Sequence, residues 1–225
     1  MKQIKFSICT ASLFMLMSCV DLNLNPLSEG SSENWYSSQA EIEMSLNDFY
    51  RTDFFPIDDM KWGDDVTARN ETSAVNNGTL TSEDGTIAKR WENYYKGIAR
   101  ALRIINNMDR ARAMGVSERD IAQYEGEAYF YLGYAYGMLA FHWGDAILDK
   151  VGMSLDEAYT ASRSPKADVL AYSYECLDKA AERLPNSYPG IQRATKGAAY
   201  AFKARIAIYN EDYAAAATAA KNCMD

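Results

Sequence analysis

A polar loop in the first third of the chain carries residue types that can bind a polar ligand. One tryptophan and one arginine lie there among carboxylates and amides: Trp62, Asp64, Asp65, Arg69, Asn70, Asn76 and Asn77. An aromatic face packs against C–H groups, while guanidinium, carboxylate and amide groups form paired hydrogen bonds. The candidate ligand-binding residues are therefore Trp62, Asp65, Arg69 and Asn70. A solvated loop, with Trp62 packed on helices beneath it, is the alternative.

The other polar residues do not form a recognisable catalytic or metal-binding set. Glu125 and Glu127 are two residues apart on a predicted helix, so they point in different directions and cannot converge on one bond. His142 is the only histidine, and no Cys, His, Asp or Glu group has metal-ligand spacing. A glycine-rich phosphate loop is also missing. We expect no enzymatic activity, no metal and no cofactor.

The N-terminal segment is typical of an exported lipoprotein. Lysines at positions 2 and 5 precede a mostly apolar run over residues 6–17, too short to span a bilayer as a helix. The run ends in Leu-Met-Ser-Cys, which resembles a bacterial lipobox. We predict a signal peptide over 1–18 and a lipidated Cys19 that anchors the chain to a membrane. An ordinary signal peptide, with Cys19 as a bystander, is the alternative.

Charge argues against nucleic acid and anionic lipid as partners. The formal net charge is −8, and removal of residues 1–18 takes away two lysines and no acids, giving about −10. No basic cluster offsets this acidic balance.

Two of the four cysteines would remain as free side chains in the mature protein. Cys9 would be cleaved off and Cys19 lipidated. Cys176 and Cys223 occupy small-residue positions in helical patterns, so we predict two buried thiols. A disulfide between them in an oxidising compartment stays open.

The hydrophobic pattern predicts an all-α fold over residues 41–225, preceded by a tether over 19–40. Apolar residues recur at helical spacing, as in the stripes Ile42, Leu46, Phe49, Tyr50 and Trp91, Tyr95, Ile98, Leu102, Ile105. Residues 53–86 and 142–164 lack this pattern and are expected to be long loops. The expected helices cover 39–50, 87–115, 118–141, 166–184, 193–209 and 213–223. No segment alternates with period two long enough to predict a strand.

Helices of this chain follow the tetratricopeptide pattern. Its first half matches Tyr129, Leu132-Gly133 and Tyr136, and its second half matches Ser173, Leu177, Ala180 and Pro185 after an insertion. A weaker second unit places small residues at Ala204, Ala207, Ala216, Ala220 and Cys223. Small residues let paired helices approach closely, so we predict tetratricopeptide-like repeats with long loop insertions.

Four motifs, in order along the chain, resemble the SusD/RagB lipoproteins. They are "SCVDLNLNP", "WENYYKGIARALRIINNMD", "EGEAYFYLGYAYGMLAFHWGDAIL" and "RATKGAAYAFKARIAIYNEDYAAAATAAKNCMD". Within the third, the family pattern is matched by Glu127-Ala128, Phe130, Tyr134-Ala135-Tyr136, Leu139 and Trp143-Gly144-Asp145. The chain departs from the pattern at Tyr129, Leu132 and Phe141-His142, where the family has basic residues. It also ends earlier than family members, which suggests an N-terminal portion.

The resemblance implies a surface lipoprotein of the outer membrane that is not a catalyst. Such proteins capture an oligosaccharide or polysaccharide and deliver it to a SusC-type TonB-dependent transporter. Their helical repeats usually face the transporter, and loops outside the repeats bind the ligand. The resemblance therefore implies that the loop residues Trp62, Asp65, Arg69 and Asn70 bind the glycan. The alternative is a lipid-anchored helical scaffold that binds protein and no glycan.

Overall fold

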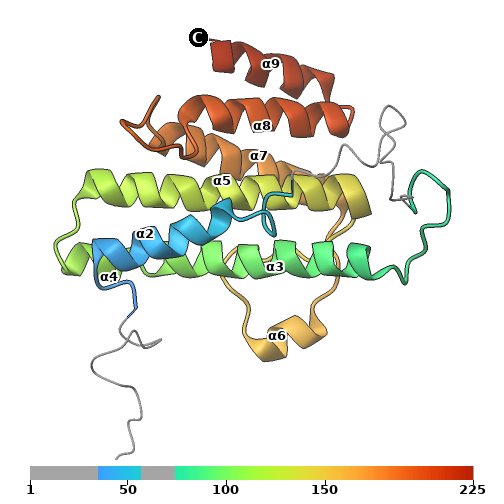
Figure 1. Ribbon diagram of the computed structural model, residues 1–225, viewed down its shortest axis with the longest axis horizontal. Helices are drawn as coiled ribbons and strands as arrows, with labels where there is room; N and C mark the ends of the chain where they lie inside the picture. The colour runs from blue at the N-terminus through green and yellow to red at the C-terminus, as the bar shows by residue number, and fades with distance from the viewer. Residues whose placement is uncertain (1–34, 57–73, 225) are drawn as a thin grey trace, which may run out of the picture. The chain divides into compact units, whose positions relative to one another are not determined.

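The computed structural model describes residues 35–56 and 74–224, and its described part is helical (Figure 1). The chain divides after Trp35 into two units, and the fold below is that of the second, Tyr36–Asp225. Its elements are α2 (Gln39–Asn47), η1 (Asp48–Tyr50), α3 (Gly85–Asn106), α4 (Met108–Ala113), α5 (Glu118–Trp143), α6 (Leu155–Thr160), α7 (Lys166–Arg183), α8 (Lys196–Tyr209) and α9 (Tyr213–Met224). No strand occurs among these residues, which confirms the predicted all-α class. Within the same residues, no helix combines the length and apolarity needed to cross a membrane.

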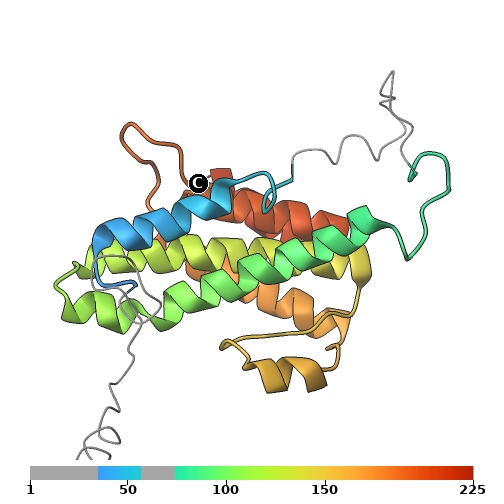
Figure 2. The ribbon, with the colours of Figure 1, turned by 60° about the horizontal axis from the view of Figure 1, so that its bottom comes forward.

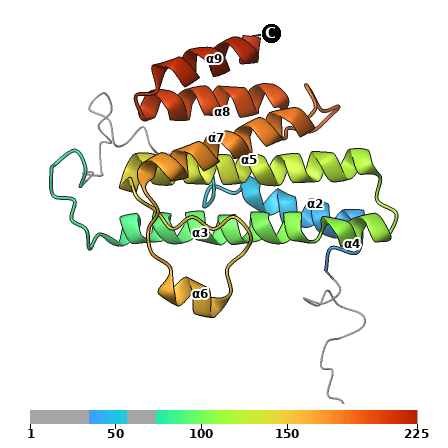
Figure 3. The same ribbon diagram turned by 180° about the vertical axis from the view of Figure 1, so that it is seen from behind.

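Helix α5 is the centre of the fold and is covered by other helices along most of its length. It packs against α3 on one side and against α7 and α8 on the other (Figures 1 and 3). Sixteen of its 26 residues are buried, among them most of its tyrosines. A helix buried all round needs small residues where its neighbours approach most closely, and three glycines of α5 meet this need. Gly133 is the clearest case, because a Cβ there would lie 2.9 Å from the carbonyl oxygen of Ser173.

The helices α5 and α7 form the predicted first repeat. Leu177 packs directly over Gly133, and the Ser173 hydroxyl donates a 2.6 Å hydrogen bond to the Gly133 carbonyl. Helix α7 ends before Pro185, as the sequence predicted. The tetratricopeptide pattern therefore identified a real close-packed helix pair.

The second repeat is formed by α8 and α9, with two corrections to the predicted contacts. Ala204, Ala207 and Ala216 are buried as expected. On α9, however, Ala219 is buried while Ala220 and Cys223 are exposed. The buried face of α9 therefore contains Ala216 and Ala219, where the sequence predicted Ala216, Ala220 and Cys223. Helix α8 covers only this side of α9, so the other side stays exposed.

The buried face of α3 also differs from the predicted stripe. Ile98 and Leu102 are buried as expected, but Trp91, Tyr95 and Ile105 are only partly buried. The buried face of α3 is centred on Tyr94, Gly97, Ala101 and Ile104. The Tyr131 ring of α5 lies against Gly97 and fills the space that a side chain at position 97 would need. Periodicity located the helix, but it favoured large residues over the small ones that face α5.

The ends of several elements differ from the sequence prediction. The helix expected to run to Gly115 is interrupted at Asn107, and α4 precedes Gly115, whose φ is +87°. Tyr50, predicted on a buried stripe, is partly exposed. The connection 142–164 contains α6, which was not predicted because none of its residues is buried. At its N-terminus, the N-cap Ser154 and the third residue Glu157 form a capping box that stabilises it locally.

The close approach of α5 and α7 can be tested by adding one methyl group. Gly133→Ala should lower the free energy of unfolding by about 2 kcal/mol, because the new Cβ would clash with the backbone of α7. Gly85→Ala is the matched control, since nothing lies within 4 Å of a Cβ at that position. Urea denaturation followed by circular dichroism measures both. Equal stability of the two variants would contradict the close packing.

Neither described cysteine is in a disulfide, and only one is accessible. Cys176 is buried, as predicted, and burial raises the pKa of its thiol to about 12. Cys223 is exposed, which corrects the second half of the prediction. Iodoacetamide should therefore label Cys223 rapidly and Cys176 only after unfolding, because the thiolate is the reactive form. Peptide mass spectrometry distinguishes the two sites, and fast labelling of Cys176 in folded protein would contradict this assignment.

Candidate functional site

The antiparallel order of the helices brings several of their ends to one side of the bundle. Helix α5 ends where α3 and α7 begin, and α8 ends on the same side (Figures 1 and 2). The loop over residues 74–84 leads into α3 at this end. Aromatic and cationic residues far apart in the sequence therefore lie near one another.

The Trp-Gly-Asp motif forms the turn at the end of α5. Trp143 is the last residue of the helix, and Gly144 has φ +73° and ψ −106°, a conformation that glycine adopts without strain. The Asp145 carboxylate accepts a 2.8 Å hydrogen bond from the backbone N–H of Lys166, the first residue of α7. An anion at this position satisfies an unpaired helix donor and interacts favourably with the helix dipole. The motif thus fixes the start of α7 relative to the end of α5.

An aromatic cluster with a guanidinium group lies next to this turn. The ring centroids of Trp91 and Trp143 are 5.3 Å apart, and Tyr95 lies 4.9 Å from Trp91. The Arg163 guanidinium is stacked 4.9 Å from the Trp91 ring, a cation–π contact. Burial raises the pKa of Tyr95 to about 12, so its hydroxyl remains protonated and donates a 2.9 Å hydrogen bond to the carbonyl of Ile147.

A pocket of about 580 Å³ opens beside this cluster. Two arginines, the end of α5 and the loop before α3 line it: Val75, Leu80, Thr81, Ser82, Ile87, Arg90, His142, Trp143 and Arg163. The volume falls in the range of small-molecule sites, and the lining combines apolar surface with a few polar groups. Such a pocket can take an uncharged polar ligand that has both C–H faces and hydroxyls.

A set of local hydrogen bonds shapes the described part of the loop. The Ala74 carbonyl accepts from the N–H groups of Thr79 and Leu80, at 2.9 and 3.1 Å. Gly78 has φ +66° within this turn. The Asp84 side chain then caps α3 by accepting a 2.8 Å hydrogen bond from the N–H of Thr86. Residues 75–82 are thereby held at the mouth of the pocket.

The sequence-predicted glycan residues stand in the first part of this same loop. Trp62, Asp65, Arg69 and Asn70 lie outside the described residues, as do Asp64 and the predicted lipidation site Cys19. Asn76 and Asn77 are described and are exposed on the turn after Ala74. The predicted site therefore stays a prediction, and its described continuation forms a wall of the pocket.

Sequence reasoning missed Trp143 and Arg163 as candidate ligand-contacting residues, and it placed Trp91 in the core. Trp91 is half-buried and packs against both of them. The Trp-Gly-Asp motif marked Trp143 as unusual, but it gave no indication of exposure. No local signal identifies Arg163, which reaches the site only because the 144–165 connection returns to α3.

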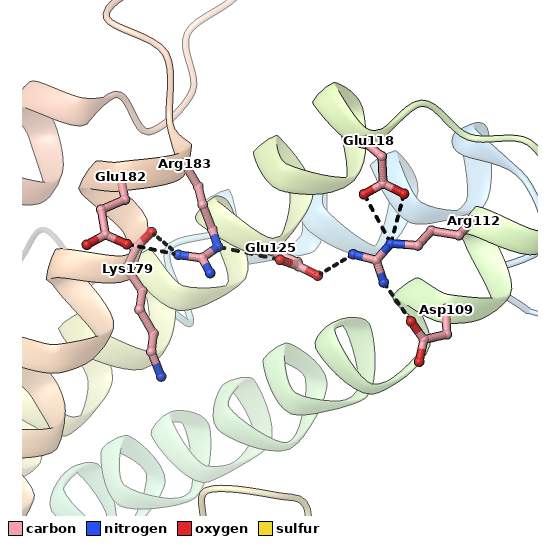
Figure 4. Close-up of polar contacts among 7 residues, drawn as sticks. All are labelled: Asp109, Arg112, Glu118, Glu125, Lys179, Glu182 and Arg183. Atoms are coloured by element: carbon pink, nitrogen blue, oxygen red, sulfur yellow. Dashed lines mark hydrogen bonds and ion pairs between the residues drawn. The ribbon is translucent and has the colours of Figure 1, made fainter.

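The two carboxylates considered for acid–base chemistry are held in separate ion pairs. Glu125 lies between Arg112 of α4 and Arg183 of α7, with N–O distances of 3.3 and 3.5 Å (Figure 4). Arg112 also contacts Asp109 and Glu118. This network joins α4, α5 and α7 at the other end of α5, far along the helix from Trp143.

Glu127 points to a different partner, as its spacing from Glu125 predicted. Its carboxylate is almost fully buried and lies 2.7 Å from the Arg193 guanidinium, and it accepts a 2.9 Å hydrogen bond from the Tyr50 hydroxyl. Burial raises the pKa of Glu127, and the nearby Arg193 opposes this rise. The same Tyr50 hydroxyl accepts a hydrogen bond from the N–H of Ala194. Together with the Glu127–Arg193 ion pair, this bond connects the loop before α8 to α5 and η1.

Replacing each glutamate separates a buried structural pair from an exposed one. Glu127→Gln should lower the free energy of unfolding by about 3 kcal/mol, because it leaves the buried Arg193 charge without a counter-ion. Glu125→Gln should cost clearly less, since its partners are partly exposed to solvent. Chemical denaturation of both variants measures the difference. A larger loss for Glu125→Gln would contradict these roles.

Comparison with known proteins places the chain in a family. The model of SusD-like proteins, described as starch-binding and associating with the outer membrane, matches residues 29–208. The chain belongs to this SusD-like family. The resemblance to the SusD/RagB family is thereby confirmed; the first of its four motifs, at 18–26, lies before the matched residues. Carbohydrate binding and association with the outer membrane are properties by which the family is described.

The relatives are distant and considerably longer. SusD-like protein P2 of Formosa agariphila is 24% identical over 93% of this chain, and SusD-like protein P38 of the same organism is 26% identical over 92%. The matches cover 44% and 42% of those relatives, so the chain spans less than half of their length.

Solved structures share the fold, among them SusD-like proteins. A SusD-like protein of Bacteroides fragilis NCTC 9343 has a TM-score of 0.71 at 22% identity, covering 87% of this chain and 39% of its own. A structure described as being with xylogluco-oligosaccharide has a TM-score of 0.66 at 17% identity, covering 82% of this chain and 40% of its own. At these identities the likeness establishes the tetratricopeptide-like fold of the SusD-like type.

Proposed function

We propose that this protein captures an oligosaccharide or polysaccharide at the outer membrane and passes it to a SusC-type TonB-dependent transporter. It acts by binding, without catalysis and without a cofactor. Family membership supports the ligand class, and the neighbour with xylogluco-oligosaccharide supports the same class. The pocket beside Trp143 is the observation that carries the proposal.

The pocket offers the two kinds of group that a sugar requires. Trp143 supplies aromatic surface, and Arg90 and Arg163 supply planar donors that can bind adjacent hydroxyls. The loop over 74–84 continues directly from the predicted residues Trp62, Asp65, Arg69 and Asn70. We propose that these four residues also bind the glycan.

The membrane location is proposed from the N-terminal sequence. A signal peptide over 1–18 and a lipid chain on Cys19 would anchor the protein to the outer membrane, and we propose that it faces the cell exterior. A tether that precedes Tyr36, shorter than the predicted 19–40, and the helical unit Tyr36–Asp225 complete the proposed organisation. A lipid-anchored protein is kept close to a transporter in the same membrane, which favours transfer of a weakly bound ligand.

Binding to immobilised polysaccharides tests the proposal. The full chain should be retarded in affinity electrophoresis by one class of plant, host or microbial glycan. Trp62→Ala and Arg163→Gln should each weaken this binding about tenfold, the loss typical of a central Trp or Arg contact. Arg119→Gln is the matched control, because Arg119 is exposed near the start of α5, at the opposite end of that helix.

The outcomes separate the glycan-binding function from the scaffold alternative. Loss of binding in Trp62→Ala and Arg163→Gln, with Arg119→Gln unchanged, supports the pocket as the ligand site. Glycan binding that none of the three substitutions alters would contradict the site. A folded chain that no glycan retards would contradict glycan capture and favour a protein-binding scaffold.

A further inference from the structure

The connection between α5 and α7 leaves the bundle, forms α6 and returns, and its returning arm carries Arg163 (Figure 3). The two arms pair where they meet the bundle. The N–H of Ala146 donates a 3.2 Å hydrogen bond to the Ser164 carbonyl, and the N–H of Ser164 donates a 2.8 Å hydrogen bond to the Ala146 carbonyl. The backbone next to Arg163 is therefore fixed to the arm that leaves α5.

Tyr95 fixes this outgoing arm to α3. Its hydroxyl donates a 2.9 Å hydrogen bond to the carbonyl of Ile147, the residue directly after Ala146. Among the described residues that line the pocket, Arg163 is present and Tyr95 is not. A change at the Tyr95 hydroxyl therefore reaches a ligand in the pocket only through the residues that this hydroxyl holds.

The Tyr95 bond and the paired arms close a ring of contacts that begins and ends on α3. Arg163 directly precedes the paired Ser164, and its guanidinium lies 4.9 Å from the centroid of the Trp91 ring. Trp91 is one helical turn before Tyr95, and the centroids of these two rings are 4.9 Å apart. A side chain held in this way loses less conformational freedom on binding a ligand than a free one, because it is already ordered.

We propose that Tyr95 is a positioning residue for the pocket: its hydroxyl holds the paired arms so that Arg163 is oriented for the ligand. This inference rests on the proposed function and adds to it a residue that does not touch the ligand. A guanidinium donates its paired hydrogen bonds in one plane, so the affinity depends on how that plane is oriented.

A second side chain of α3 provides the matched control. Further along the outgoing arm, the Tyr136 hydroxyl bonds to the backbone of Asp149, and the Asn106 amide donates a 2.8 Å hydrogen bond to the carbonyl of Val151. The Asn106 bond is of the same kind as the Tyr95 bond, since each joins a side chain of α3 to a carbonyl of this arm. Only the Tyr95 bond is adjacent to the paired arms, so only its loss should release Arg163.

NMR spectroscopy of the full chain tests the placement of Arg163 without a ligand. The Nε–H signal of Arg163, identified by its absence in Arg163→Gln, should have a chemical shift displaced by the ring current of Trp91. Tyr95→Phe should move this signal toward the value of an unstructured arginine, and Asn106→Ala should leave it in place. An unchanged signal in Tyr95→Phe would overturn the proposal.

Titration calorimetry with maltoheptaose and with a xylogluco-heptasaccharide tests the effect on binding. For the ligand that binds the wild-type chain, Tyr95→Phe should weaken affinity about fivefold and Asn106→Ala less than twofold. Adding Tyr95→Phe to Arg163→Gln should weaken affinity less than twofold further, because the residue that Tyr95 places is then missing. A fivefold loss in both backgrounds would overturn the proposal, since a purely structural role of Tyr95 gives that result.

The inference and the proposed function fail in different ways. Binding that depends on Arg163 but not on Tyr95 would overturn the inference and leave the proposed function intact. A folded wild-type chain that binds neither ligand, nor any polysaccharide of the electrophoresis test, would contradict glycan capture; the NMR signal would still show whether Tyr95 places Arg163. Thermal unfolding of each variant verifies that the protein is folded.

Discussion

The fold depends on how closely its neighbours can approach helix α5. Gly97 of α3 accommodates the Tyr131 ring, and Gly133 accommodates Leu177 and the backbone of α7. These contacts bury α5 on several sides at once, which one amphipathic stripe could not do. Because α3, α5, α7 and α8 follow one another as antiparallel neighbours, the same packing brings their ends together (Figure 1). The candidate ligand surface is a direct consequence of this arrangement.

The two ends of α5 differ in their polar contacts. Near the start of α5, the ion pairs of Glu125 with Arg112 and Arg183 join α4, α5 and α7 (Figure 4). Near its end, Asp145 caps α7, and the Tyr136 hydroxyl accepts from the N–H of Asp149 while it donates to the carbonyl of that residue. These bonds are satisfied within the protein. Among the described residues, the pocket at that end is lined by Trp143, Arg90 and Arg163 together with apolar side chains, a combination suited to an uncharged polar ligand.

Sequence patterns predicted the helices well because helical burial repeats along the chain. They also identified the α5–α7 pair, since its small residues occur at fixed spacing. They failed where three-dimensional contacts decide exposure. Only large residues were expected on the buried face of α3, but Gly97 and Ala101 are also part of it. Ala220 and Ala219 are chemically identical, and only the position of α8 decides which of them is buried.

The candidate site was predictable only in part, for the same reason. The composition of residues 62–77 indicated a ligand loop, and its described end does line a pocket. Arg90, Trp143 and Arg163 belong to three distant segments, so no local pattern could place them around one pocket. Helix α6 was missed because it has no buried face, and its stability comes from capping instead.

Hydrogen exchange with and without a bound oligosaccharide tests the central claim most directly. The claim is that this end of the bundle, where α5 and α8 end and α3 and α7 begin, is the glycan surface. The account predicts that the ligand slows exchange in residues 74–90, 141–145 and 161–166, and leaves the turn over 107–118 unchanged. Protection confined to the α4–α5 end of the molecule, or to α9, would contradict it.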